Sequence, residues 1–205
     1  MEVPQTLNGA LRRLPAWTIY IIGAIYAVWE FWRALNQIGP YLVEPINVLE
    51  RAYGEVALIL MVAGLSVTPL RNWTGVNLIK FRRAIGVTTF FYVLAHFLVF
   101  AILDVQSISR VWEEIVKRPY VTVGMASFLM LIPLAITSNN RAVRKMGAGA
   151  WRKLHKLTYP AAILGALHYL WLVKGFQLEP IIYLGVILGL IATRYLVVVR
   201  KRQLA

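Results

Sequence analysis

Six separate runs of apolar residues, each 15 to 20 residues long, constrain this chain more than any other feature of its sequence. A helix needs about 20 mostly apolar residues to cross the ~30 Å hydrocarbon layer of a membrane. The runs therefore predict an all-α integral membrane protein, a bundle of six transmembrane helices. The predicted spans are residues 17–35, 56–70, 84–103, 119–137, 157–173 and 180–199.

The segments between the spans are too short to form another domain. In a chain of 205 residues, 59% of them hydrophobic, six spans leave no room for a soluble catalytic unit. We predict one membrane domain over residues 17–199, with a cytoplasmic N-terminus at 1–16 and a cytoplasmic tail at 200–205. A cleaved signal peptide is the alternative for the first span, but Glu30 and Arg33 within it favour a retained helix.

The lysines and arginines are distributed unevenly between the two sides of the predicted bundle. Sixteen of the 22 fall on the side that carries both chain termini, and six fall on the other side. Because cytoplasmic loops collect positive charge, both termini are predicted to lie inside, N-in and C-in. This asymmetry accounts for the net charge of +13, so we expect no nucleic-acid binding. The basic segment 141–156 is instead interpreted as a surface for lipid headgroups or a soluble partner.

The chain has no cysteine and three histidines, which limits the metal chemistry open to it. Disulfides, thiol catalysis and iron–sulfur clusters are excluded, and histidine is left as the main nitrogen ligand. No glycine-rich phosphate loop follows a strand and opens a helix, so a nicotinamide donor would have to act through another protein.

Two of the histidines are predicted to lie at the same depth in the membrane. His96 lies 14 residues after Arg82, about 21 Å along the third span, and His168 lies 13 residues after His155, about 19.5 Å along the fifth. Both spans run outward, so His96 and His168 should meet in the outer half of the bundle. Two imidazoles from two helices can bind one haem iron from both sides, which is typical of an electron carrier.

Arg82 and small residues near the histidines extend this interpretation. Arg82 and His96 differ by only 40° around the helix and so share a face, where the arginine could bind a haem propionate or stand in the place of a ligand. Ala161 and Gly165, and similarly Gly86, are predicted to leave room for a flat cofactor.

Other roles for the same residues remain open at this point. A histidine inside the membrane can simply hydrogen-bond between helices, and Arg82 can be a topology anchor. Glu30 with Arg33, and Arg51 with Glu55, have the spacing of ordinary ion pairs. In a small transporter, the alternative from a different functional class, carboxylates and histidines would line a proton or solute path.

Several motifs in order along nearly the whole chain resemble the MsrQ family, also called YedZ. They are SVTPLR at 66–71, FRRAIGVTTFFYVLAH at 81–96, KRPYVTVG at 117–124, LAITS at 134–138 and WRKLHKLTYPAAILGALHYLWLVK at 151–174. The family is similar to the membrane domain of ferric reductases and NADPH oxidases. The resemblance implies a b-type haem subunit of the bacterial inner membrane. Such a subunit passes electrons to a periplasmic molybdopterin-containing methionine sulfoxide reductase (MsrP-like) and reduces no sulfoxide itself.

The resemblance also implies cofactors, donors and ligands. Quinone or a cytoplasmic flavin reductase would donate the electrons, and flavin mononucleotide is associated with the family. His96 and His168 match the outer haem pair, and His155 matches the first histidine of the fifth helix. Where two-haem relatives have another histidine on the third helix, this chain has Arg82 or Arg83, so one or two haems are expected. Another ferric-reductase-like cytochrome b, serving iron or oxygen chemistry, is the nearest alternative.

Overall fold

The regular secondary structure of the chain is helical. The computed structural model describes the backbone of residues 2–203 and the side chains of residues 4–194, and no strand occurs in this part. The α-helices are α1 (Glu2–Arg13), α2 (Thr18–Leu35), α3 (Pro45–Thr74), α4 (Arg82–Leu98), α5 (Ile108–Lys117), α6 (Pro119–Ile136), α7 (Asn140–Met146), α8 (Ala148–Leu154), α9 (Thr158–Leu172) and α10 (Leu178–Gln203). Shorter segments are the 3-10 turns η1 (Gly39–Leu42), η2 (Ile79–Phe81) and η4 (His155–Leu157), and the π-helical η3 (Val99–Asp104).

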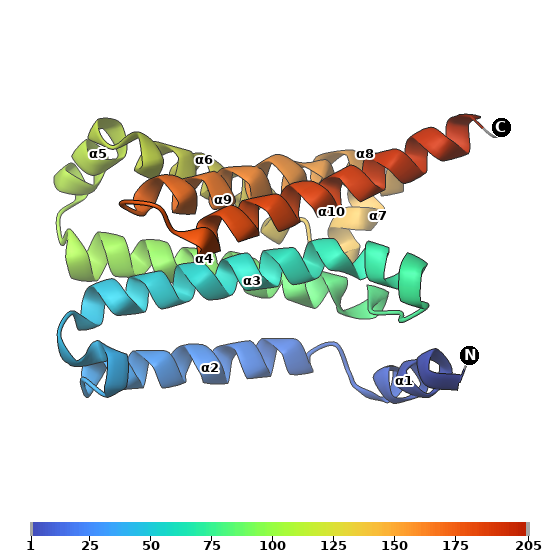
Figure 1. The fold of residues 1–205 in the computed structure, drawn as a ribbon, viewed down its shortest axis with the longest axis horizontal. Helices are drawn as coiled ribbons and strands as arrows, with labels where there is room; N and C mark the ends of the chain where they lie inside the picture. The colour runs from blue at the N-terminus through green and yellow to red at the C-terminus, as the bar shows by residue number, and fades with distance from the viewer. Residues whose placement is uncertain (1, 204–205) are drawn as a thin grey trace.

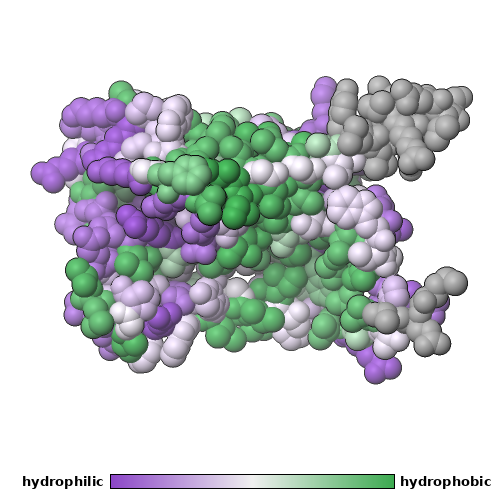
Figure 2. All heavy atoms as spheres, in the orientation of Figure 1, coloured by the Kyte–Doolittle hydropathy of each residue, from purple (hydrophilic) through white to green (hydrophobic). Residues whose placement is uncertain are grey.

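The long helices α2, α3, α4, α6, α9 and α10 run side by side, and both termini lie at one end of the bundle (Figure 1). We call this end, with α1, α7 and α8, the basic end. The opposite end, with η1 and α5, is the acidic end. Eight of the nine acidic residues lie in the half toward the acidic end: Glu30, Glu44, Glu50, Glu55, Asp104, Glu113, Glu114 and Glu179. Figure 2 shows apolar side chains along the middle and hydrophilic ones gathered at the ends.

Three helices in the described part are long and apolar enough to cross a membrane. They are Pro45–Thr74, Ile79–Asp104 and Pro119–Ile136. The segments Pro4–Arg13 and Thr18–Leu42, bent by 76° at their junction, add a fourth if they count as one span. This result supports a multi-pass membrane protein. Crossing by α9 and α10, and hence the count of six, stays a prediction.

The helix boundaries differ from the predicted spans in two respects. α3 begins at Pro45 rather than at residue 56. Proline is favourable in the first turn of a helix, and the polar residues that follow it can remain helical where the helix projects beyond the apolar layer. The predicted loop at 104–118 contains α5, a short amphipathic helix whose Ile108, Trp112 and Val116 are exposed on one face. Its periodicity is helical, but ten residues are too few for a span.

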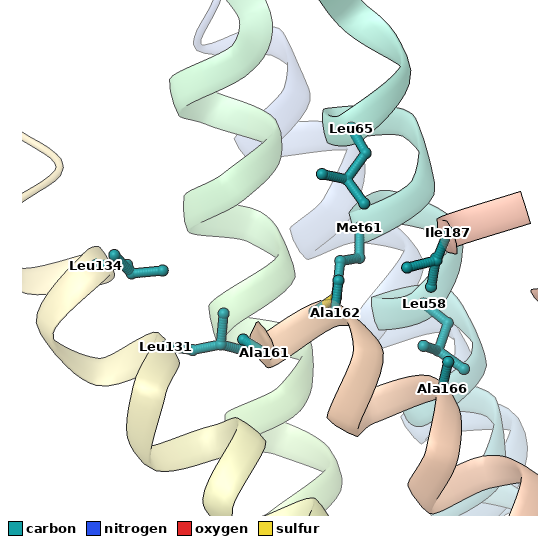
Figure 3. Close-up of a cluster of buried hydrophobic side chains, with 9 residues drawn as sticks. All are labelled: Leu58, Met61, Leu65, Leu131, Leu134, Ala161, Ala162, Ala166 and Ile187. Atoms are coloured by element: carbon teal, nitrogen blue, oxygen red, sulfur yellow. The ribbon is translucent and has the colours of Figure 1, made fainter. Parts of the chain in front are cut away.

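The main buried cluster joins α3, α6, α9 and α10 and holds α9 in the middle of the bundle. Figure 3 shows its side chains: Leu58, Met61, Leu65, Leu131, Leu134, Ala161, Ala162, Ala166 and Ile187. The three alanines of α9 are fully buried, and their small size lets neighbouring backbones approach. Ser127 Oγ of α6 donates to the carbonyl of Ala161 at 2.8 Å, which fixes α6 against α9.

A buried polar cluster closes the acidic end of α2. The Glu30 carboxylate accepts from Arg33 Nη1 at 3.0 Å, as the spacing predicts, and from the Tyr41 hydroxyl at 2.5 Å. The predicted pair of Arg51 with Glu55 is wrong, since no ion pair joins them in the described side chains. Both side chains are exposed, where water competes with such a pair.

The Tyr41→Phe substitution should lower stability by about 1.5–3 kcal/mol, because it removes a hydrogen bond to a buried carboxylate. Unfolding of the purified protein by SDS, followed by circular dichroism, measures this loss. Tyr20→Phe is the matched control, because Tyr20 is exposed on the same helix, α2, as Glu30. Equal unfolding curves for Tyr41→Phe and the unsubstituted protein would contradict the prediction.

Candidate functional site

The structure brings His96 of α4 and His168 of α9 together, although 72 positions separate them in the sequence. Their ring centroids are 6.1 Å apart and the ring planes meet at 75°. His96 lies two residues before the end of α4, where the π-helical η3 begins. Single π-helical turns are frequent next to functional sites, because they re-aim the side chains beside them.

A backbone carbonyl fixes the tautomer of each imidazole. His96 Nδ1 lies 2.8 Å from the carbonyl oxygen of Glu50, and His168 Nδ1 lies 2.7 Å from that of Tyr120. A carbonyl oxygen can only accept, so each Nδ1 carries the hydrogen and donates. Each Nε2 therefore keeps its lone pair for a metal, and the hydrogen bond at Nδ1 orients the ring, as in other metal-binding histidines.

A glycine four residues after each of these carbonyls lets the imidazole approach. A Cβ atom on Gly54 would lie 3.2 Å from His96 Nδ1, and one on Gly124 would lie 2.7 Å from His168 Nδ1. In a helix the residue four positions on donates to the same carbonyl, so its side chain would cover the approach to that oxygen. The two sites share one design: Glu50 with Gly54 on α3, and Tyr120 with Gly124 on α6.

The separation of the two rings fits a single metal between them. Imidazole nitrogens about 2 Å from one ion place the ring centroids roughly 6 Å apart, close to the observed 6.1 Å. Among the described residues, no group of three or more histidine, aspartate or glutamate side chains could hold a metal ion. A donor set of two imidazoles fits a haem iron, because the porphyrin supplies that ion's other nitrogen ligands.

Two of the three small residues predicted to make room for a cofactor pack between helices. Ala161 is fully buried where α9 meets α6, and a Cβ atom on Gly165 would contact Ser127 of α6. Gly86 has no side chain within 4 Å of its position. Close contact between helices explains Ala161 and Gly165. The glycines that face the imidazoles lie on other helices than the histidines do. Residue spacing within the helix that carries the histidine therefore cannot reveal them.

His155 lies at the basic end, apart from the facing pair. Its Nε2 is 3.1 Å from the hydroxyl of Thr137, and its ring stacks on Trp151 with centroids 3.8 Å apart. Burial lowers the pKa of His155, and the charges of Arg82 and Arg83 lower it further. The lowered pKa favours the neutral imidazole, the form that a metal requires.

Arg82 begins α4 at the same end, with an exposed side chain close enough to influence His155. Sequence reasoning missed Arg194 of α10, which donates to the hydroxyl of Tyr159 at 3.0 Å and to the carbonyl of Leu65 at 2.7 Å. An arginine this far along an apolar helix is the one indication in the sequence, and the charge asymmetry between the two sides also explains it.

Comparison with known proteins agrees with this architecture. Residues 51–166, more than half of the chain, match the family described as ferric reductase like transmembrane component. The matched region contains His96 and His155 and ends two residues before His168. The fold and the match together define a ferric-reductase-like transmembrane protein.

Relatives in curated collections identify the particular family. The chain is 40% identical over 179 residues to the protein-methionine-sulfoxide reductase heme-binding subunit MsrQ of Brucella anthropi, and equally to those of Brucella ovis and Brucella abortus. Each alignment covers 87% of this chain and 80% of the relative. The chain therefore belongs to the MsrQ family. No solved structure matches it.

Proposed function

We propose that this protein is a b-type haem membrane subunit that carries electrons across the bacterial inner membrane. The acceptor is a periplasmic molybdopterin-containing methionine sulfoxide reductase of the MsrP type, which repairs oxidised periplasmic proteins. The observation that carries the proposal is the facing pair of His96 and His168, each with Nδ1 bound to a carbonyl and Nε2 free. Membership of a family whose relatives are named heme-binding subunits supports it.

The two histidines would hold the haem iron through their Nε2 atoms. Haem would supply reversible one-electron transfer, and an iron held by two imidazoles would have no site for substrate. The carbonyls of Glu50 and Tyr120 hold the rings in place, so little rearrangement is needed when the charge changes. The chain acts as an electron-transfer subunit without sulfoxide chemistry of its own.

The orientation follows from charge. With six spans over residues 17–199 and both termini in the cytoplasm, the basic end faces inward and the acidic end faces the periplasm. The facing histidines then lie in the outer half. The partner docks at the acidic end, where a cavity of about 310 Å³ opens beside α5. Its lining residues are Asp104, Val105, Arg110, Glu113, Glu114 and Arg118.

Electrons enter at the basic end, from the quinone pool or from a cytoplasmic flavin reductase. Segment 141–156 carries six lysines and arginines over α7, α8 and η4, and none of its residues is acidic. Such a surface attracts a soluble donor, anionic lipid or the phosphate of flavin mononucleotide.

A second, inner haem completes the path across the membrane. His155, whose Nε2 lies beside the Thr137 hydroxyl, would hold its iron, and Arg82 would bind a propionate or act as a weak ligand. A direct bond from arginine to iron is costly because the guanidinium stays protonated, which favours the propionate role.

The haem content of the purified protein tests this arrangement. We expect about two haems per chain by pyridine haemochrome titration, and about one in His155→Ala, since an imidazole ligand is lost. Thr158→Ala is a control at the same turn, because its hydroxyl bonds only the local carbonyl of His155. One haem in the unsubstituted protein, unchanged by His155→Ala, would contradict the inner site.

A further inference from the structure

The basic end of the bundle contains a half-buried arginine without a charged partner among the described side chains. Of the nine acidic residues, only Glu2 belongs to this half. The ion pairs of the described side chains all lie at the acidic end, in α2, in α5 and at Arg118, which directly follows α5. A cation inside the membrane is expensive unless an anion compensates it. Among residues 4–194, no acidic side chain in this half can compensate an arginine here.

Arg194 is such an arginine. Its Nη1 donates to the Tyr159 hydroxyl and its Nη2 to the Leu65 carbonyl, both uncharged acceptors. Its guanidinium carbon lies 5.5 Å from the centre of the Tyr159 ring. Its Nε is buried and has no hydrogen-bond partner. A buried donor without a partner costs about 1–3 kcal/mol, and more for a charged group, so an additional acceptor is expected here.

A second arginine lies within reach of the same place. Arg82 is close enough to Arg194 for their charges to repel, and Tyr159 is near both. Arg82 also acts on His155. The contacts of Arg194 point inward, to α3 and α9, and so away from surrounding lipid. An anion bound by Arg194 at this point would therefore lie inside the bundle, against α3 and α9.

We infer that Arg194, together with Arg82, binds the carboxylates of a haem at the inner position. This inference rests on the proposed inner haem and adds Arg194 to its binding site. A guanidinium binds a carboxylate through two parallel N–H donors, and Nε is one of the nitrogens that can take part. Arg194 thus positions the haem from α10, a helix that carries none of the histidines.

The test is a redox titration and haem count for Arg194→Gln, Arg194→Lys and two controls. Removing a cation beside a haem favours its more positive, oxidised state. We expect Arg194→Gln to shift the equilibrium between the reduced and oxidised forms of one haem about tenfold toward the oxidised form. This shift is a decrease of about 59 mV in the midpoint potential of that haem. Loss of that haem is the other expected result. Arg194→Lys should keep the haem, with a midpoint potential close to that of the unsubstituted protein.

The controls separate charge from structure. Tyr159→Phe removes the hydroxyl that accepts from Arg194 and keeps the charge. Arg13→Gln removes an exposed arginine at the end of α1 that is not part of the proposed haem site. Tyr159→Phe should shift the inner haem less than Arg194→Gln does, because the charge stays, and Arg13→Gln should shift neither haem. The spectrum of the outer haem reports folding in every variant. In the His155→Ala background, Arg194→Gln should not change the midpoint potential of the outer haem that remains.

Unshifted potentials and full haem content in Arg194→Gln would overturn the inference. Loss of a co-purifying anionic phospholipid from Arg194→Gln, with both haems unchanged, would also overturn it and assign the site to a lipid phosphate. A haem count that His155→Ala does not change means instead that the inner haem itself is absent. The two failures are therefore distinguishable.

Discussion

Replacing His168 or His96 with alanine should remove the outer haem completely and leave one haem per chain. Each imidazole supplies one of the two axial bonds, and its Nε2 has no substitute within the pair. Loss of a supporting residue around a metal costs 10–100-fold in affinity or activity, so loss of a ligand should cost more, at least about 100-fold in electron transfer to the acceptor. Pyridine haemochrome titration and reduced-minus-oxidised spectra measure the haem that remains.

The two variants should behave alike, because the ligands act as a pair on one iron. His155→Ala is the control, since His155 lies at the other end of the bundle and should leave the spectrum of the outer haem intact. A variant without His96 or His168 that kept both haems, with unchanged spectra, would disprove the assignment of the ligands.

Gly124→Ala should weaken haem binding by about 10–100-fold, although it adds only one methyl group. Its Cβ would lie 2.7 Å from Nδ1 and 3.0 Å from Cγ and Cε1 of His168, contacts that force the ring to move. The ring would then leave the Tyr120 carbonyl that orients it. Haem retention during dilution or transfer to apomyoglobin measures the loss of affinity.

A graded series of glycine variants makes this prediction specific. Gly54→Ala should have a smaller effect, since its Cβ would lie 3.2 Å from His96 Nδ1. Gly185→Ala, at an exposed position of α10, should have none on haem binding, because the position has open space around it, and alanine suits a helix better than glycine. Equal haem retention in Gly124→Ala and Gly185→Ala would contradict the role of the glycines.

The long helices and the histidine pair could be predicted because both depend on regular local patterns. Apolar runs set α2, α6 and α9 to within a residue or two, and the 1.5 Å helical rise was enough to put His96 and His168 at one level. Amphipathic α5 is not predicted, because it is too short and too polar to resemble a membrane-spanning helix.

The remainder of the site depends on which helices become neighbours. Nothing within the third span shows that Glu50 and Gly54 of α3 face His96. Nothing within the fifth span shows that Tyr120 and Gly124 of α6 face His168. The motif KRPYVTVG already contained the second carbonyl and its glycine, four residues apart, without indicating their purpose. The hydrogen bonds of Arg194 likewise depend on its neighbours α3 and α9, which the sequence of α10 does not identify.

The central claim is that His96 and His168 fill both axial positions of one iron. Exposure of the dithionite-reduced His155→Ala variant, which isolates the outer haem, to carbon monoxide tests it most directly. A six-coordinate iron with two imidazoles has no open position, so the reduced spectrum should stay unchanged. Immediate formation of a stoichiometric carbon monoxide adduct in the folded protein would show an open iron position and contradict the account.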